Sequence, residues 1–170
     1  MQTSGNTILI TGGGSGIGFE LARAFARRNN RVIICGRDEE RLAAAQTETP
    51  GMEIRRCDLG VATDRAELVT WALERFRQLN ILVNNAAAVS SVDLTQDALD
   101  FEQAQQELVT DLFAPIDLAL RFLPHFRRQA AAAVINVTTG KCTVRMRAPR
   151  STQQPRSGYM RGPMHCEVRQ

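Results

Sequence analysis

A run of glycines directly after a short apolar segment constrains the fold of this chain more than any other feature. Residues 7–11 (Thr-Ile-Leu-Ile-Thr) have the β-branched composition of a buried strand. The loop that follows is rich in glycine and contains Gly12, Gly13, Gly14, Gly16 and Gly18. Glycines let the backbone approach a phosphate, and a helix that starts there offers free N–H groups and the positive end of its dipole. The loop predicts a dinucleotide-binding site, with a purely structural turn as the alternative.

The rest of the body alternates short β-branched runs with longer amphipathic stretches, which is typical of a parallel α/β sheet. Further strands are predicted over residues 31–35, 52–57, 81–84 and 133–138. Helices are predicted over 16–29, from the N-cap Asp38 to about residue 46, over 64–78, and in two stretches over 97–128. In the first helix, the residues at helical spacing are Ile17, Leu21, Ala24, Phe25 and Arg28. Strands this apolar are buried on both faces, so we expect a Rossmann-type doubly wound parallel sheet with ligands at its carboxyl edge.

Net charge and composition both change near Gly140. Residues 1–140 hold 14 Arg and 17 Asp or Glu, a net charge of −3, whereas residues 141–170 hold one Lys, six Arg and one Glu, a net charge of +6. The last thirty residues contain no Phe, Leu or Ile. A segment so poor in large apolar side chains cannot bury enough surface to offset its ordering entropy. We expect an incomplete nucleotide-binding domain over residues 1–140 and a disordered basic tail over 141–170.

Composition excludes several classes of protein. With 44% hydrophobic and 23% charged residues the body is not intrinsically disordered, and no apolar run approaches the roughly 20 residues of a membrane span. The four cysteines lack C-x-x-C spacing and the N-terminus lacks a secretory signal, so we predict a reduced, cytoplasmic protein. His165 and Cys166 have no further ligands at metal spacing, and the basic tail has one aromatic residue. We therefore predict neither a metal site nor nucleic-acid binding.

The end of the second predicted strand bears on which dinucleotide is bound. A domain that binds NAD usually presents Asp or Glu at this point to the ribose hydroxyls, whereas this chain has Cys35-Gly36-Arg37. The charge and the forked donors of an arginine suit a 2′-phosphate. Arg37 therefore favours NADP(H) over NAD(H), with a solvated arginine at the start of a helix as the alternative.

Four separated motifs resemble those of the short-chain dehydrogenase/reductase family. The family pattern T-G-x-x-x-G-x-G is matched at residues 11–18, an aspartate after the third strand at Asp58, and N-N-A-G by Asn-Asn-Ala-Ala at residues 84–87. Residues 135–140 (Ile-Asn-Val-Thr-Thr-Gly) resemble the fifth strand and the catalytic-serine turn. The stretch Val-Ile-Ile-Cys-Gly-Arg at residues 32–37 also resembles a branch of bacterial oxidoreductases found with teichoic-acid D-alanylation genes.

The resemblance implies an oxidoreductase that exchanges a hydride between a nicotinamide dinucleotide and a carbonyl or alcohol substrate, whose identity the sequence does not indicate. In the family a tyrosine acts as general acid or base, and a lysine lowers its pKa and holds the ribose. A serine orients the substrate oxygen, and an asparagine supports a water relay. The cofactor-binding residues implied here are Thr11, Gly12, Gly14, Ser15, Gly16, Ile17, Gly18, Arg37, Asp58, Leu59, Asn85, Ala86 and Ala87.

The chain departs from the family pattern at all four catalytic positions. Asp111 stands at the asparagine position and Thr139 at the serine position. The Tyr-x-x-x-Lys motif is absent, because the single tyrosine, Tyr159, is followed four residues later by Pro163, and the single lysine is Lys141. A proline at the lysine position would also disrupt the helix that presents both side chains.

Three hypotheses about function remain open from the sequence. The chain is a truncated and catalytically incompetent dehydrogenase, an enzyme that uses Thr139 with a substitute proton donor, or a non-enzymatic NADP(H)-binding or interaction protein. We favour the first, because the chain ends before the further strands, the substrate loop and the long interface helix of the family. Without that helix we do not expect a family-type oligomer, and we expect an exposed edge on the fifth strand. His125 is interpreted as a cap or surface residue and not as a base.

The tail is further predicted to be the product of a frameshift. In the frame that starts at the third base of each codon, residues 151–156 (Ser-Thr-Gln-Gln-Pro-Arg) can encode Tyr-Ser-Ala-Thr-Lys, the missing motif. The recovered tyrosine lies thirteen positions after Thr139, which is the family spacing. Twenty Arg to one Lys indicates a GC-rich gene, in which stop codons are sparse in wrong frames. Chance agreement through codon degeneracy is the alternative, and the gene sequence distinguishes the two.

Overall fold

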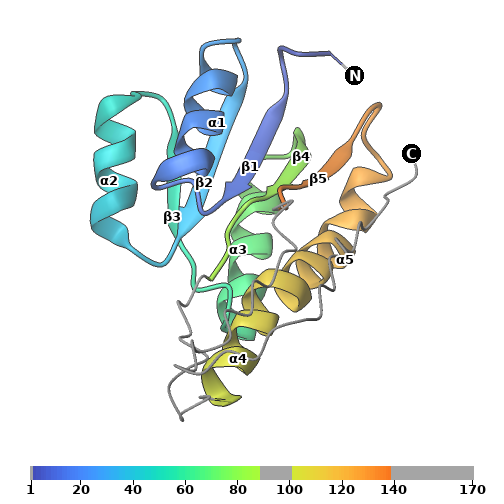
Figure 1. Ribbon diagram of the computed structural model, residues 1–170. Helices are drawn as coiled ribbons and strands as arrows, with labels where there is room; N and C mark the ends of the chain where they lie inside the picture. Colours follow the sequence, from blue (N-terminus) through green and yellow to red (C-terminus); the bar gives the residue numbers. More distant parts are fainter. Residues whose placement is uncertain (1, 89–100, 139–170) are drawn as a thin grey trace, which may run out of the picture. The chain divides into compact units, whose positions relative to one another are not determined.

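A computed structural model describes residues 2–88 and 101–138, which form a parallel sheet with helices on both faces (Figure 1). The sheet order is β3-β2-β1-β4-β5, and every neighbouring pair is parallel. The strands are β1 (Thr7–Thr11), β2 (Arg31–Gly36), β3 (Glu53–Arg56), β4 (Leu79–Asn84) and β5 (Ala133–Asn136). The helical elements are α1 (Gly16–Ala26), α2 (Glu39–Glu48), α3 (Ala62–Arg75), α4 (Phe101–Leu108), η1 (Val109–Phe113) and α5 (Ala114–Phe126). The predicted Rossmann-type sheet is confirmed.

Alternation along the central strands divides the core into two layers. Leu9 of β1 and Leu82 of β4 pack with α3 and α5, whereas their neighbours Ile8 and Ile81 pack with α1 and α2. Figure 1 shows these two pairs of helices on opposite sides of the sheet. All five residues of β1 are buried, because a central strand with helices on both faces has no exposed side.

The strand order places a topological switch point between β1 and β4. The chain runs outward from β1 to β2 and β3, and α3 then returns it to the other side of β1. The loops after β1 and β4 therefore diverge at the carboxyl edge of the sheet and leave a crevice between them. This crevice positions the candidate site.

Helix α1 ends earlier than predicted and buries a different face. It stops at Ala26, and Asn29 adopts a left-handed conformation with φ 58°. The Asn30 side chain then donates to the Phe25 carbonyl oxygen at 3.0 Å, which terminates the helix in place of another turn. The buried residues are Gly18 and Ala22, whereas Ile17, predicted at the start of the apolar spacing, is 68% exposed because it faces the crevice.

The predicted pair of helices before β5 is one continuous helical element with a wider turn in its middle. Helices α4 and α5 flank the π-helical turn η1, in which each backbone bond spans one extra residue. The local sequence gives no signal for this turn, and π-turns are frequent at functional sites. Its inner side faces the carboxyl edge of the sheet.

Strand β5 and the outer side of α5 leave apolar side chains exposed. β5 is an outer strand of the five described, and Val134 is 41% exposed, as expected for that edge. Helix α5 buries one stripe against the sheet, including Leu118 and Phe122, and exposes a second stripe that includes Ile116 and Leu120. Within the described residues, no helix is long and apolar enough to cross a membrane. The predicted disorder of 141–170 lies outside the described residues.

Candidate functional site

A cleft of about 450 Å³ opens at the carboxyl edge of the sheet, where the loops after β1, β2, β3 and β4 meet. Such a volume is typical of small-molecule sites. The lining comprises glycine-loop residues, the end of β2 with the start of α2, the loops after β3 and β4, and one residue of η1. These residues are Gly12, Gly14, Ser15, Ile17, Gly18, Gly36, Arg37, Asp38, Arg41, Leu42, Cys57, Asp58, Leu59, Asn85, Ala86, Ala87, Ala88 and Thr110.

Two glycines of the loop after β1 are required by the local geometry. A methyl group added at Gly18 would overlap the carbonyl oxygen of Gly12 and the side-chain amide of Asn85, so α1 packs too closely on the neighbouring loops for any side chain. Gly16 has φ +55° and faces open space, with no atom within 4 Å of the position of a Cβ. The backbone is therefore bare at the point where α1 begins, which is the geometry that admits a phosphate.

The free N–H groups at the start of α2 are capped by a side chain, whereas those at the start of α1 are not, within the part of the chain that the structure describes. Among the described residues, the Ser15 side chain caps none of the N–H groups of α1. At α2 the Asp38 carboxylate accepts a hydrogen bond from the Arg41 N–H at 3.1 Å, which confirms the predicted N-cap. The open donors of α1 and the positive end of its dipole face the cleft, and they suit an anion.

Thr11 and Asn85 hold the loops after β1 and β4 together. The Thr11 hydroxyl accepts hydrogen bonds from the N–H groups of Asn85 and Ala86 at 3.0 and 3.1 Å. The Asn85 side chain donates to the carbonyl oxygen of Thr11 at 3.1 Å. Thr11 is buried beneath the cleft, whereas Asn85 and Ala86 line it. Both predicted residues therefore shape the crevice.

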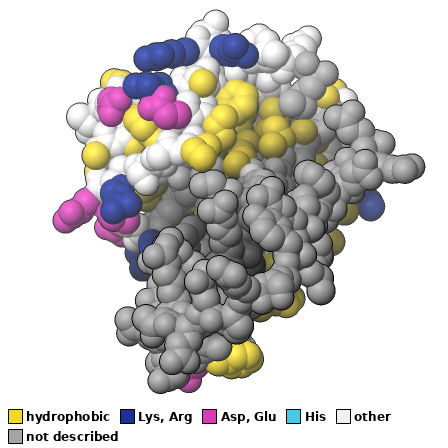
Figure 2. Space-filling model, in the orientation of Figure 1, with side chains coloured by type: hydrophobic (Ala, Val, Ile, Leu, Met, Phe, Trp, Pro, Cys, Tyr) yellow, Lys and Arg dark blue, Asp and Glu magenta, His cyan; other side chains and the backbone are white. Residues whose placement is uncertain are grey.

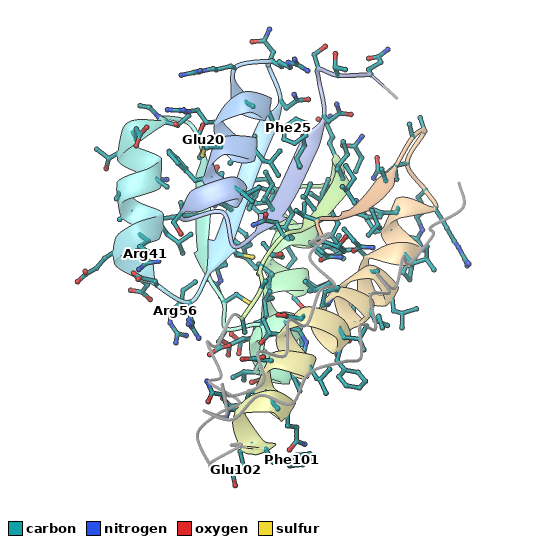
Figure 3. The ribbon with its side chains drawn as sticks, viewed as in Figure 1. Glu20, Phe25, Arg41, Arg56, Phe101 and Glu102 are labelled. Carbon is teal, nitrogen blue, oxygen red and sulfur yellow. The ribbon has the colours of Figure 1, made fainter. Side chains whose placement is uncertain are left out.

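Positive charge enters the cleft from the end of β2 and the start of α2. Arg37 is exposed and forms no ion pair within the part of the chain described. Arg41 lies one turn further on, with its Nε 3.1 Å from an Asp38 oxygen. Figure 3 shows Arg41 near the start of α2 and Arg56 at the end of β3, at the same end of the sheet. On the described part of the face in Figure 2, basic and acidic side chains are interspersed beside a hydrophobic area.

The turn after β3 is fixed by hydrogen bonds within itself and to α3. The Asp58 N–H donates to the Asp64 carboxylate at 2.9 Å, and the Asp58 carboxylate accepts from the Gly60 N–H at 2.9 Å. Asp58 and Leu59 both line the cleft, on the side of β2 and β3. One Asp58 oxygen is committed to the turn, and the carboxylate retains further acceptor capacity.

Asp111, at the predicted asparagine position, joins η1 to the loop after β4. Its Oδ1 accepts a hydrogen bond from the Ala88 N–H at 2.7 Å. The neighbouring Thr110 lines the cleft directly. The π-turn thus brings two consecutive side chains to the carboxyl edge, one onto the loop and one onto the cleft.

The two described cysteines are buried thiols with raised pKa values. Burial raises the pKa of Cys35 well above its ordinary value, and the neighbouring Cys57 adds to the shift. Burial, followed by the charges of Asp64 and Asp58, raises the pKa of Cys57 to about 12. Cys57 lines the cleft, but at neutral pH it is a neutral thiol and a poor nucleophile.

Most of the predicted cofactor residues converge on this cleft. Of the catalytic positions, Asp111 lies within the described residues and the others do not. Of the predicted cofactor set, Thr11 lies beneath the cleft and Gly16 beside its lining, and the others line it. Thr139, Lys141, Tyr159 and Pro163 lie outside the described residues. His125 contacts the carbonyl oxygen of Leu79 at 2.9 Å, at the opposite edge of the sheet.

Arg41 and Thr110 line the cleft but were not predicted from the sequence. Arg41 had a usable signal, because the N-cap at Asp38 places it in the first turn of α2 beside the end of β2. Thr110 had none, because its position depends on the π-turn and on the packing of α5.

Comparison with known proteins identifies the class to which this cleft belongs. The family model for short chain dehydrogenases matches residues 6–149. The uncharacterized oxidoreductase DltE of Bacillus subtilis (strain 168) is 39% identical over 140 residues, which cover 82% of this chain and 56% of that protein. The L-fucose dehydrogenase of Bos taurus is 32% identical over 136 residues, 80% of this chain and 50% of that protein. The chain thus spans about half the length of these curated relatives.

A solved structure of a short-chain oxidoreductase has a similar fold. The crystal structure of a metagenomic short-chain oxidoreductase in complex with NADP superposes with a TM-score of 0.72 at 28% identity, covering 79% of this chain and 63% of that one. The family resemblance predicted from the four sequence motifs is confirmed. The bacterial branch indicated by residues 32–37 is confirmed by the similarity to DltE. The chain belongs to the short chain dehydrogenase family.

Proposed function

We propose that the cleft binds NADP(H) in preference to NAD(H), as the cofactor site of a short-chain oxidoreductase. The observation that carries the proposal is the start of α1 at Ser15, which faces the cleft and which no side chain caps within the described residues. Arg37, which has no ion-pair partner in that part of the chain, lines the same cleft. An uncapped helix start suits a pyrophosphate, and an arginine in place of an acidic residue at the end of β2 suits a 2′-phosphate.

The residues that line the cleft suit the adenosine and pyrophosphate parts of such a cofactor. The bare backbone at Gly16 would receive the pyrophosphate, Arg37 the 2′-phosphate, and Asp58 with Leu59 the adenine end. The nicotinamide end would then lie toward Ala86 and the loop after β4. Bound nicotinamide supplies the site of hydride exchange with a carbonyl or alcohol substrate.

We further propose that this chain binds the cofactor without turning over a substrate. The sequence has no Tyr-x-x-x-Lys motif, since Tyr159 is followed by proline at the lysine position. A phenol needs a nearby cation to bring its pKa toward neutrality before it can exchange protons usefully. General acid or base catalysis of this kind contributes about 10²–10⁴-fold, so we expect no consumption of NADPH above background with aldehydes or ketones.

The preference for NADP(H) is tested by calorimetric titration of the Arg37→Asp variant. We expect its affinity for NADPH to fall by about 1–3 kcal/mol, the contribution of charge-assisted hydrogen bonds to a phosphate. The matched control is Arg77→Asp, which makes the same change of charge at an exposed position between α3 and β4, at the other edge of the sheet. Equal affinity of the unmutated protein for NADPH and NADH would contradict the preference.

A second candidate is a non-enzymatic NADP(H)-binding or interaction protein, favoured by a cleft that keeps the glycine loop and Arg37 in a sequence that lacks the catalytic pair. Binding without turnover in a soluble, stably folded chain supports this candidate over a non-functional fragment. Steady turnover abolished by Thr139→Ala would contradict both and indicate an enzyme with a substitute proton donor.

A further inference from the structure

The guanidinium of Arg65, on α3, is buried although it lies outside the cleft. The Arg65 side chain is only 9% exposed. Its Nε donates to Asp117 Oδ2 of α5 at 2.7 Å, and its Nη1 donates to the carbonyl oxygen of Leu59 at 2.6 Å. Leu59 lines the cleft, so this buried cation holds the backbone of a cleft residue directly.

Asp117 fixes the other side of this contact. Its Oδ1 accepts from Arg121 Nε at 2.6 Å, so the carboxylate lies between two arginines. Burial favours the neutral acid, but the hydrogen bonds from Arg65 and Arg121 outweigh it and lower the pKa of Asp117. The carboxylate is therefore charged at neutral pH and keeps the Arg65 guanidinium oriented.

The same helical element also reaches the cleft at η1. A Cβ at Gly60 would lie 4.0 Å from the Thr110 hydroxyl, so the turn after β3 runs beside η1. Thr110 lines the cleft, and Asp111 holds the Ala88 N–H at 2.7 Å. The turn after β3 and the loop after β4 are thus both tied to one helical element, the first through Arg65.

Stability alone gives a weak reason for burying the Arg65 side chain of this ion pair, whose Asp117 side chain is still 25% exposed. Taking a charge out of water costs about as much as the attraction to its partner returns, and an apolar side chain of similar volume is often equally stable. What an apolar side chain cannot do is hold a carbonyl oxygen and a carboxylate at fixed distances in one plane, which a guanidinium does.

We propose that Arg65 is a positioning residue for cofactor binding, which sets the turn at Asp58 and Leu59 against the helix that carries Thr110 and Asp117. The inference rests on the proposed function, because it assigns the positioned turn to the adenosine half of NADP(H). Arg65 is not among the residues that line the cleft, and it would act on the cofactor only through Leu59.

The test uses the full chain with Arg65→Met, Arg65→Lys and the control Arg121→Met. The control also removes an arginine from Asp117 but leaves the contact between Arg65 and Leu59 intact. Hydrogen exchange of the amides of residues 58–61 is measured without ligand. Kd values for NADPH and for 2′,5′-ADP, which carries the adenosine half alone, are measured well below each melting midpoint.

We expect Arg65→Met to speed exchange in residues 58–61 by about tenfold and to weaken both ligands by about tenfold, as loss of a charged hydrogen bond predicts. Arg65→Lys should show the same losses, because one ammonium cannot span both oxygens, while Arg121→Met should match the unmutated protein. If Arg65→Met does not fold, Arg65→Lys decides the matter.

Unchanged exchange and unchanged Kd values in the Arg65 variants, whatever their melting midpoints, would overturn the inference. Equally fast exchange and equally weak binding in Arg121→Met would also overturn it. The losses would then come from removing any arginine from Asp117 and not from the contact between Arg65 and Leu59. If the unmutated chain binds neither ligand, the proposed function fails, and the exchange measurement alone still decides whether Arg65 positions the turn.

Discussion

The two edges of the sheet satisfy their polar groups in opposite ways. At the amino edge, three asparagines bond to one another: Asn30 Oδ1 accepts from the Asn6 N–H at 3.0 Å, and the Asn80 side chain donates to Asn6 Oδ1 at 3.0 Å. At the carboxyl edge, within the described residues, no side chain caps the start of α1, and the buried side-chain atom without a partner is Asn84 Oδ1. The amino edge is closed by its own side chains, whereas at the carboxyl edge the start of α1 leaves N–H donors open to the cleft.

The largest effect is expected from restoring the catalytic tyrosine and lysine that the sequence lacks. A chain whose frame is restored downstream of Gly140, so that it encodes Tyr-Ser-Ala-Thr-Lys thirteen positions after Thr139, should turn over NADPH with a carbonyl substrate. The expected gain is about 10²–10⁴-fold over the present chain, from the general acid alone. The rate of NADPH oxidation measures it. A gene without this motif in any downstream frame would contradict the frameshift.

Gly18→Ala should damage the cleft more than any other single methyl group. The added Cβ would overlap the Gly12 carbonyl oxygen and the Asn85 amide, so we expect a loss of about 1–3 kcal/mol in the free energy of unfolding. We also expect Kd for NADPH to rise at least about tenfold, since α1 must shift. The control is Gly36→Ala, in the same cleft, where the Cβ would lie 3.8 Å from Leu42. Equal effects of the two substitutions would count against the close approach.

At the amino edge, Asn30→Ala should lower stability without changing cofactor affinity. Its side chain accepts from Asn6 and donates to the carbonyl oxygens of Thr3 and Phe25 at 3.0 Å each. Losing these buried bonds should lower the free energy of unfolding by about 1–3 kcal/mol and leave Kd for NADPH unchanged below the melting midpoint. Asn30→Asp keeps the acceptor but sets a carboxylate oxygen against the two carbonyl oxygens, so it should lose at least as much stability as Asn30→Ala. A change in Kd would show that the two edges are not independent.

The smallest effect is expected at Asp111. An asparagine there keeps the oxygen that accepts from the Ala88 N–H, so Asp111→Asn should leave the free energy of unfolding nearly unchanged. Asp111→Ala should lose about 0.5–1.5 kcal/mol, the value of one ordinary hydrogen bond. Chemical denaturation of the two variants measures the difference. A larger loss in Asp111→Asn than in Asp111→Ala would show that the charge, and not the hydrogen bond, fixes η1.

Sequence reasoning succeeded where structure is set by neighbours along the chain. The strand periodicity, the glycine loop and the N-cap at Asp38 are local patterns, and each appears where it was predicted. The left-handed Asn29 that ends α1 was missed although Asn-Asn at residues 29–30 is a local signal for the end of a helix. The π-turn around Asp111 was missed because it is tied to the distant loop after β4. Arg65 was missed for the same reason, since its carboxylate partner lies 52 residues away.

The central claim is tested most directly by calorimetric titration of NADPH into the 170-residue chain, with NADH titrated in parallel. We predict saturable binding at one site, tighter for NADPH than for NADH, and no loss of NADPH absorbance when an aldehyde is added. No heat of binding from either cofactor, or NADPH consumption that depends on the protein, would contradict a cleft that binds the cofactor without catalysis.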